Sequence, residues 1–270
     1  MRKALICLLA LVSALLALPS AAGATPTVKV KAQAVPIPGF PHTGDILGAG
    51  TAAHGEITIE GNEYLGSPPP LIGVNVYLPL GVQLHPNGFP TCDASTIENL
   101  GPSACPKGSA AGPVGKAIGF VTFGGERVEE TAELLTFYGP GGGAYVLADG
   151  HTPVSLEILS TERLVKAGDS GGSGPEMSVN VPLVASVPGA PYVSVRSVDL
   201  QAGSAYRSHG RTIYYARLPH TCPSGGWPAR EEVIFAEDGE PSRPETVDVS
   251  ERVPCPSEAA AAHRSRGARR

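Results

Sequence analysis

The chain has 270 residues, of which 34 are glycine and 27 are proline, and only 17% are charged. This low charge excludes a coiled coil or a charged tail protein, and glycine and proline recur too often for long helices. The hydrophobic fraction of 42% and the period-two runs exclude wholesale disorder, which leaves a β-rich globular protein with many turns.

The first 24 residues have the organisation of a secretory signal peptide. Arg2 and Lys3 form a positive start, an apolar run extends from Ala4 to Leu18, and Ala22 and Ala24 have the spacing of a signal-peptidase site. Such a run is short for a bilayer span of about 20 residues. We predict cleavage after Ala24, no transmembrane segment in the mature chain, and a protein that is secreted or held in the cell envelope.

The mature chain would be acidic. Cleavage removes two basic residues and no acid, which leaves 18 basic against 25 acidic residues. A net charge of −7 repels phosphate groups, so we expect no nucleic acid partner. Residues 258–270 hold four arginines and no strand pattern, and are predicted to form a disordered tail.

Alternation of apolar and polar residues predicts about a dozen strands separated by turn signals. The predicted strands are 28–35, 56–60, 72–78, 117–123, 132–138, 144–148, 154–159, 177–181, 192–200, 212–218, 231–236 and 245–249. No crossover helix fits between them, which excludes a parallel α/β fold. Residues 25–257 are therefore predicted to form an antiparallel β-sandwich of immunoglobulin-like or jelly-roll type, with a barrel as the neighbouring alternative. The Gly/Ser-rich stretch 166–175 is where this region could divide in two.

Four cysteines remain after cleavage: Cys92, Cys105, Cys222 and Cys255. An even number in an exported chain predicts two disulfides. Three pairings are open, and the nearest-neighbour pairing, Cys92–Cys105 and Cys222–Cys255, closes the shorter loops. Because no C-x-x-C occurs and no histidine has ligand spacing to a cysteine, we expect no metal, and nothing indicates a cofactor.

One short helix is predicted inside the first cysteine loop. Ser95 and Glu98 match a capping box, in which each side chain bonds to the backbone N–H of the other. The sequence Leu100-Gly101-Pro102 then provides a stop. The helix would be clamped by the disulfide.

Four stretches of the chain are similar to an uncharacterised family of secreted bacterial proteins. They are Gly73–Pro79, Leu84–Cys92, Gly101–Ser109 and Val187–Pro191. Cysteines and prolines fall in the same order from about residue 56 to 256. The resemblance implies export, β structure and disulfides; it implies no reaction and carries over no functional residue, because the family has no known function.

Two fragments resemble chymotrypsin-like serine proteases. They are GDSGG at residues 168–172 and TAAH at residues 51–54. In that family Ser170 would be the nucleophile and His54 its general base. An aspartate should lie between them to hold the imidazole, and Asp93 and Asp149 are the candidates. Neither has the family's sequence around it, so we expect a decoy motif and assign no catalytic residue.

An acidic cluster around a predicted turn could serve a sugar or a cation. It consists of Glu126, Glu129, Glu130 and Glu133. Paired carboxylates are the machinery of glycoside hydrolysis, and carboxylate oxygens bind calcium. An exposed hairpin tip produces the same pattern without function, and this is the interpretation we favour.

Aromatic residues could stack on sugar rings if they were exposed. Trp227 lies near Cys222, and Tyr192, Tyr206, Tyr214 and Tyr215 could help it. Large aromatic side chains are mostly buried, so we expect Trp227 to belong to the core.

Together these patterns favour a non-enzymatic, secreted β-sandwich protein with a structural or binding role at the cell envelope. A carbohydrate-binding module is the first alternative and a chymotrypsin-like serine hydrolase the second. The partner that fits best is an envelope polymer or a glycan.

Overall fold

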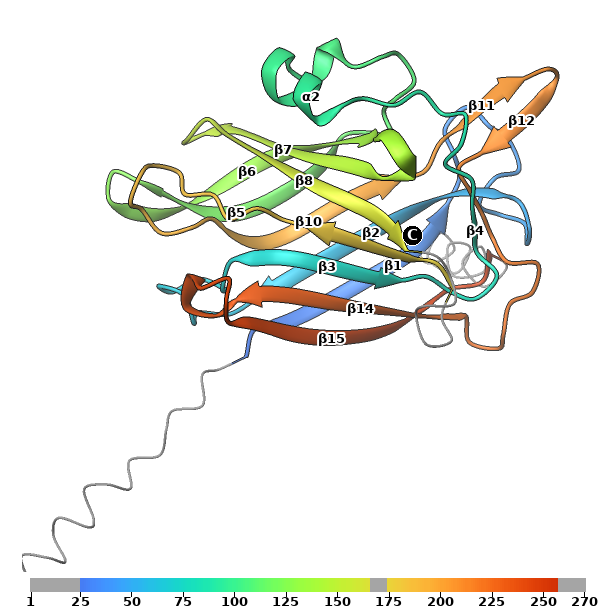
Figure 1. The fold of residues 1–270 in the computed structure, drawn as a ribbon. Helices are drawn as coiled ribbons and strands as arrows, with labels where there is room; N and C mark the ends of the chain where they lie inside the picture. The colour runs from blue at the N-terminus through green and yellow to red at the C-terminus, as the bar shows by residue number, and fades with distance from the viewer. Residues whose placement is uncertain (1–24, 166–173, 257–270) are drawn as a thin grey trace, which may run out of the picture.

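The structure is a computed structural model that describes residues 25–165 and 174–256 (Figure 1). Its strands are β1 (Thr27–Val35), β2 (Gly50–Glu60), β3 (Leu71–Tyr77), β4 (Gln83–Leu84), β5 (Gly115–Phe123), β6 (Glu126–Tyr138), β7 (Ala144–Thr152), β8 (Leu156–Val165), β9 (Glu176–Asn180), β10 (Ser194–Ala202), β11 (Ala205–Ser208), β12 (Arg211–Tyr214), β13 (Ala216–Arg217), β14 (Trp227–Ala236) and β15 (Pro244–Val253). The α-helix is α2 (Ala94–Leu100), and three 3-10 turns complete the elements.

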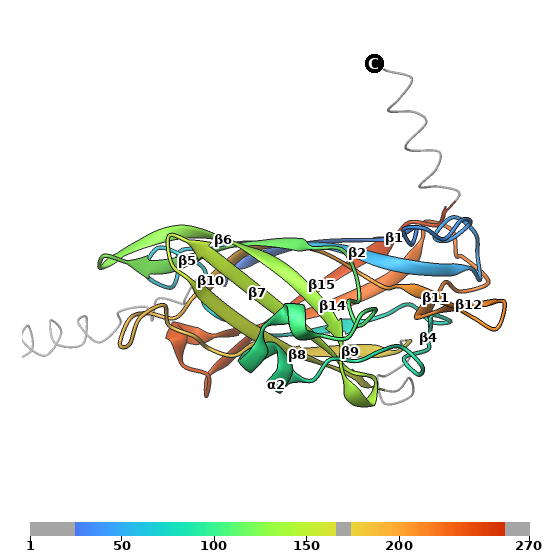
Figure 2. The same cartoon turned by 90° about the horizontal axis from the view of Figure 1, so that it is seen from above.

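Thirteen of the strands form one antiparallel sheet, and β11 and β12 form a separate hairpin. The order is β15-β14-β3-β9-β8-β7-β6-β5-β10-β2-β13-β4, with β1 paired to β2. The sheet curls until β1 lies beside β15 (Figures 1 and 2). The predicted antiparallel all-β fold is confirmed, while the immunoglobulin-like or jelly-roll type stays a prediction.

Every predicted strand overlaps an observed one, but β6 begins earlier than predicted. Its first residues, Glu126 to Glu130, were expected in a turn, and they pair with β5 instead. Alternation fails there because Glu130 is a buried carboxylate and Arg127 a half-buried cation, at positions where a strand usually has apolar residues.

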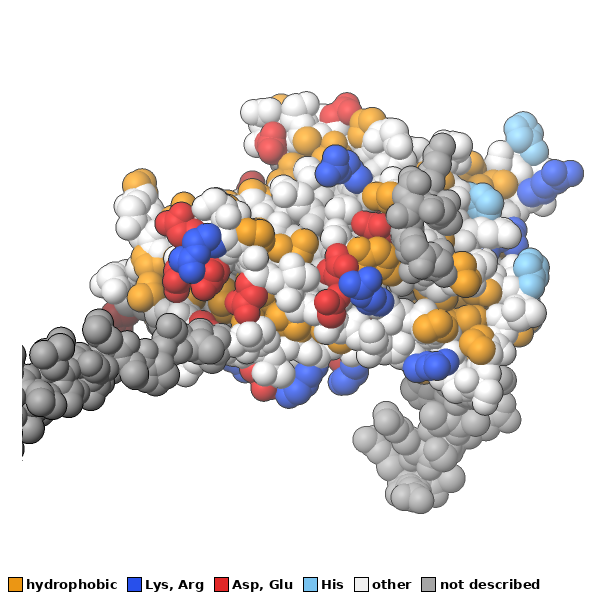
Figure 3. Space-filling model, turned by 60° about the horizontal axis from the view of Figure 1, so that its bottom comes forward, with side chains coloured by type: hydrophobic (Ala, Val, Ile, Leu, Met, Phe, Trp, Pro, Cys, Tyr) orange, Lys and Arg blue, Asp and Glu red, His pale blue; other side chains and the backbone are white. Residues whose placement is uncertain are grey.

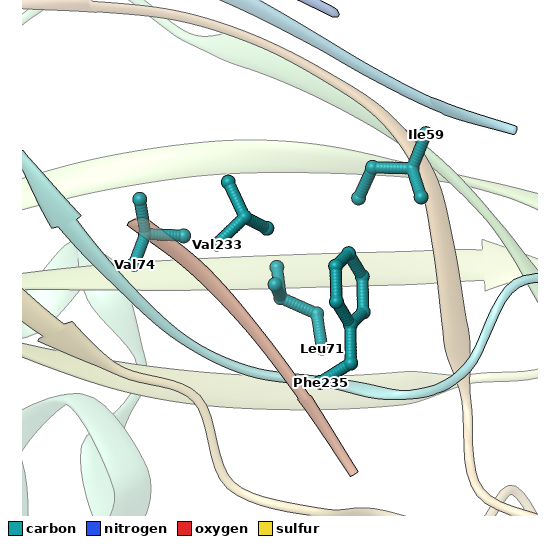
Figure 4. Close-up of a cluster of buried hydrophobic side chains, with 5 residues drawn as sticks. All are labelled: Ile59, Leu71, Val74, Val233 and Phe235. Atoms are coloured by element: carbon teal, nitrogen blue, oxygen red, sulfur yellow. The ribbon is translucent and has the colours of Figure 1, made fainter. Parts of the chain in front are cut away.

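The main core lies between the walls of the curled sheet. Its fully buried members are Ile59, Leu71, Val74, Val233 and Phe235, which lie together in Figure 4. They come from β2, β3 and β14, strands that are far apart in sequence. Burial of apolar side chains from both walls holds the curled sheet closed.

The helix covers the outer side of the sheet, over β6 and β7. Figure 1 shows the helix above these strands. Ile97 of α2 packs with Phe137, Leu147 and Cys92. The predicted disulfide Cys92–Cys105 is present. The predicted capping box is wrong in detail: the helix starts at Ala94 with Asp93 as its N-cap, and no side chain makes a capping hydrogen bond there.

The second predicted disulfide, Cys222–Cys255, is also present. It joins the chain just before β14 to the chain just after β15. Strands β8 and β9, on either side of the proposed division at 166–175, pair with each other in the same sheet. Among the described residues, no helix is long and apolar enough to cross a membrane. The predicted signal peptide and arginine tail lie outside the described residues.

Candidate functional site

The outer surface of β9, β3, β14 and β15 carries two rows of polar side chains. Residues opposite one another on antiparallel strands point to the same side of the sheet. One row is Glu176, Tyr77, Arg230 and Ser250, and the next is Ser178, Asn75, Glu232 and Asp248. Figure 3 shows this side of the molecule, with acidic and basic side chains lying together and hydrophobic ones beside them. We call Asn75, Tyr77, Arg230, Glu232 and Asp248 the polar face.

A network of hydrogen bonds fixes every side chain of the polar face. Tyr77 Oη and Asn75 Nδ2 both donate to Glu232 Oε2, at 2.9 and 3.1 Å. Arg230 Nη2 donates to Glu232 Oε1 at 2.6 Å and to Asp248 Oδ1 at 2.7 Å. These charge-assisted bonds are the stronger kind, and they hold the polar groups in one arrangement.

The aromatic ring and the cation of the polar face also contact each other. The Arg230 guanidinium lies 5.0 Å from the centre of the Tyr77 ring, a cation–π distance. Burial and the hydrogen bond to Glu232 raise the pKa of Tyr77 to about 12. The Tyr77 hydroxyl therefore remains a hydrogen-bond donor throughout the physiological range of pH.

A groove of about 410 Å³ runs beside the polar face. Its apolar lining includes Leu78, Leu80 and Pro228, and its polar lining includes Tyr77, Arg230 and Arg252. Arg252 donates to the Gly226 carbonyl oxygen at 3.0 Å and, within the described chain, has no carboxylate partner. The volume falls in the range of small-ligand sites, where a few polar groups orient a ligand on apolar walls.

The sequence alone did not identify this site, because its residues belong to predicted strands. A signal was nevertheless present. The outward positions of residues 72–78 and 231–236 alternate with apolar ones and include Asn75, Tyr77 and Glu232. Nothing in the sequence shows that β3 and β14 are neighbours, since more than 140 residues separate them along the chain.

His54 lies on the outer surface of β2, away from the polar face, and has two polar partners. Its Nδ1 is 3.0 Å from Gln33 Nε2 of β1, and its Nε2 is 2.8 Å from Asp199 Oδ1 of β10. With the Gln33 amide donating to Nδ1, the ring proton is on Nε2 and is donated to Asp199. The basic nitrogen of His54 is thus already occupied.

The protease-like motif is therefore only partly assembled in the described residues. The aspartate beside His54 is Asp199, whereas the candidates expected from the sequence lie elsewhere. Asp93 occupies the N-cap position of α2, and Asp149 lies 3.3 Å from His151. Asp199 follows the serine motif in the chain, whereas the acid precedes the serine in chymotrypsin-like enzymes. Ser170 and the rest of GDSGG lie outside the described residues.

His54 and Asp199 also form a cluster with Glu56. Their three potential metal-ligand atoms lie within 4.8 Å of one another. A histidine nitrogen with two carboxylates suits a divalent transition metal. The groups already satisfy each other, however, because His54 bonds to Asp199 and Lys31 lies 3.2 Å from Glu56. We assign no metal to this cluster.

The acidic cluster of the sequence is divided between the two sides of β6. Glu130 is buried, and the backbone N–H groups of Thr152 and Val154 donate to its carboxylate at 2.9 and 3.1 Å. Glu129 is half exposed and pairs with Arg196. The cluster therefore does not present a pair of carboxylates to a sugar, and Glu130 acts to hold the following loop.

The aromatic residues that could have bound a sugar are largely internal. Trp227 is only 3% exposed and donates from Nε1 to the Thr221 carbonyl oxygen at 2.8 Å, as expected for a core residue. Tyr215 is buried in an aromatic cluster with Tyr206, and Tyr214 lies under the Arg217 guanidinium. The aromatic residue at a groove is Tyr77, which the sequence did not single out.

Comparison with known proteins identifies no relative: no family model matches the chain, and no curated protein or solved structure is similar to it. The chain is thus an all-β protein with a polar face on the outside of its sheet and a groove beside that face.

Proposed function

We propose that this chain is a secreted, non-enzymatic protein that binds a polyhydroxylated polymer of the cell envelope, such as a glycan, at the polar face and its groove. The observation that carries the proposal is the network in which Arg230 joins Glu232 and Asp248 beside Tyr77. It offers hydrogen-bond donors and acceptors that are already fixed in position, which lowers the entropic cost of binding.

The mixture of charges favours a neutral ligand over a strongly charged one. Arg230 and Arg252 are balanced by Glu176, Glu232 and Asp248 on the same surface. A polyanion would be repelled by the carboxylates and a polycation by the arginines. Sugar hydroxyls both donate and accept hydrogen bonds, so they match such a surface.

The groove adds an apolar component that suits the carbon–hydrogen faces of sugar rings. Leu80 is 65% exposed, and Leu78 and Pro228 line the same groove. Glu232 and Asp248 are both engaged by Arg230, so neither is free to protonate a leaving group. The geometry thus supports binding more than cleavage.

Secretion is part of the proposal. It is supported by the signal-peptide pattern of residues 1–24 and by two disulfides, which persist in oxidising compartments. Membership in the secreted bacterial family that the sequence resembles belongs to the proposal as well.

Binding can be tested with a glycan array and with pull-down on insoluble envelope polysaccharides. We expect Arg230→Ala to weaken binding at least tenfold, since hydrogen bonds to charged groups contribute about 1.5–3 kcal/mol. Lys29→Ala, a surface ion-pair residue on β1, is the matched control and should bind as the wild type does. Absence of binding to every glycan, or full binding by Arg230→Ala, would contradict the proposal.

A serine hydrolase remains the second candidate because of one observation, the hydrogen bond between His54 and Asp199. An imidazole held by a carboxylate is two thirds of a catalytic triad. This candidate requires Ser170 to react, which covalent labelling tests directly.

A further inference from the structure

The inner face of β14 and β15 holds two carboxyl groups that the polar face does not use. Glu231 is 3% exposed, and Glu251 is half-buried. Glu231 lies opposite Val249 and Glu251 lies opposite Ala229, so the two occupy neighbouring inward positions on adjacent strands. Two carboxyl groups inside an apolar layer need either a cation or a proton to balance them.

Each of the two carboxyl groups has one buried oxygen that no donor among the described residues reaches. Glu231 Oε2 and Glu251 Oε1 are buried, and no N–H or hydroxyl group of the described chain donates to them. The two carboxyl groups are close enough that each influences the pKa of the other. Two carboxyl groups can share a hydrogen bond only when one of them is protonated.

The pair lies at the place where the curled sheet closes. Strands β1 and β15 are side by side, yet in the described chain β1 forms a ladder only with β2, and β15 only with β14. Glu251 bridges this seam, because its Oε2 accepts a hydrogen bond from the Ala32 backbone N–H of β1 at 3.0 Å. A side chain of β15 thus accepts the hydrogen bond from β1 that a backbone carbonyl group would accept in a regular strand pair.

We propose that Glu231 and Glu251 form a single proton-binding site that fastens β1 to β15 and loosens this seam when its proton leaves. In the closed state the Glu231 carboxyl donates its proton to Glu251, and Glu251 also accepts from Ala32. When the Glu231 O–H bond ionises, the proton goes to water and two adjacent negative charges remain. Their repulsion is relieved when Glu251 turns toward the groove that it lines, which breaks the bond to Ala32.

Within the described part of the chain, no cation faces the pair to offset this repulsion. Most charged and titratable side chains of the strands packed around it occupy outward positions; they are Lys29 and Lys31 of β1, Tyr77 of β3, Arg230 and Glu232 of β14, and Asp248 and Arg252 of β15. Glu245 of β15 has an inward position, opposite Phe235, but it lies near the other end of the strand from Glu251 and is not a cation. Glu162 points inward from β8, but its charge acts on Tyr138 and Tyr215 and not on Glu231. The pair therefore titrates as an isolated unit.

The position of the switch on the pH scale follows from burial. Burial, with the neighbouring Glu251 as the second cause, raises the pKa of Glu231 to about 7. Burial also raises the pKa of Glu251, while its bonds from Ala32 and Glu231 act in the opposite direction. Proton release therefore falls near neutral pH, and the inference does not depend on the proposed glycan binding.

Carbon-13 NMR of the glutamate carboxyl groups, recorded from pH 4 to 9, measures the site directly. We expect one inner-face carboxyl to titrate near neutrality, and this signal to disappear in Glu231→Gln. Glu60→Gln, an exposed ion-paired residue on β2, is the matched control and should leave the signal unchanged. Burial also raises the pKa of Glu162 to about 7, so its signal could be confused with that of Glu231. The Glu162→Gln variant identifies the signal of Glu162. If both inner carboxyls are fully ionised below pH 5, the proposal is wrong.

Hydrogen exchange at the Ala32 amide measures the consequence. After correction for the intrinsic pH dependence of exchange, we expect its protection factor to fall severalfold as pH rises through 7, while Ile118 in the β5–β10 ladder keeps its protection. In Glu231→Gln the introduced side-chain amide donates permanently to Glu251, so Ala32 should stay protected. If Glu231→Gln does not fold, Glu251→Gln can replace it in this experiment. Two results would contradict the proposed proton-binding site: protection of Ala32 that is constant with pH in the wild type, or protection that falls equally in the variants.

Discussion

Strands β14 and β15 carry carboxylates on both of their faces, and the two faces hold them in opposite ways. Outside, Glu232 and Asp248 are both bound by Arg230 at 2.6 and 2.7 Å. Inside, Glu231 and Glu251 have no cation among the described residues and are left to share a proton. The same residue type, one position along the strand, is therefore ionised and paired in one case and held as an acid in the other.

This difference arises because successive side chains of a strand point to opposite faces of the sheet, one facing solvent and the other the interior. Solvent screens the outer pair, and a surface ion pair of this kind contributes little stability. The inner pair is desolvated, so its protonation state is coupled to folding. Binding at the outer face should thus depend little on pH, while the stability that the inner pair contributes should change with pH.

Removal of the Cys222–Cys255 disulfide should have the largest effect, because it ties together the strands that carry both faces. We expect the Cys222→Ser/Cys255→Ser variant to lose about 2–5 kcal/mol of unfolding free energy in urea titrations. The Cys92→Ser/Cys105→Ser variant should lose less, since its loop spans 13 residues against 33. An equal or larger loss in the second variant would contradict this order.

The inner pair should give the protein a stability that depends on pH. The pKa of Glu231 is about 7 in the folded protein against an ordinary 4.5, so between these values the folded state holds a proton that the unfolded state has lost. The contribution of Glu231 to the unfolding free energy should be complete below about pH 4.5 and fall by roughly 3 kcal/mol as pH rises to about 7, at 1.36 kcal/mol per pKa unit.

Chemical denaturation at several pH values measures this fall. Glu231→Gln should remove it and be more stable than the wild type at pH 8. Because burial also raises the pKa of Glu162 to about 7, the comparison is best made in a Glu162→Gln background. A Glu231→Gln variant that keeps the full slope in that background would show that another group is responsible.

The outer face should respond differently. Arg230 donates from Nε and Nη2 to the same oxygen of Asp248, Oδ1. Asp248→Asn removes the negative charge of this exposed ion pair, so we expect a loss of no more than about 1 kcal/mol of stability. The slope of stability between pH 5 and 8 should remain that of the wild type. Thermal melts across this range check both statements, and a changed slope would mean that the two faces are coupled.

The smallest effect is expected at the protease-like serine. A serine hydroxyl is a poor nucleophile without a base, and His54 is occupied by Gln33 and Asp199. Ser170→Ala should change stability by no more than about 0.5 kcal/mol, and the wild type should not react with a fluorophosphonate probe. Labelling at Ser170 that disappears in His54→Ala would make the protein a hydrolase.

Features that depend on interactions between residues close together in the chain could be predicted from the sequence alone. Alternation placed strands such as 28–35 and 72–78 close to their observed bounds, and the even number of cysteines with neighbour pairing predicted both disulfides. It also predicted the burial of Trp227. These features follow from side-chain size, loop length and local backbone preference. Each of these properties is set by residues that lie within a few tens of positions of one another in the sequence.

Which strands are neighbours depends on the tertiary structure, and these neighbours form the polar face, the surroundings of His54 and the inner carboxyl pair. The polar face needs β3 beside β14, the partner of His54 comes from β10, and the proton site needs β1 to meet β15. In the sequence Glu231 and Glu232 are adjacent and chemically identical. Burial inside the curled sheet gives the first a proton and contact with Arg230 gives the second a countercharge, because charge is stabilised by what surrounds it in space and not by its neighbours along the chain.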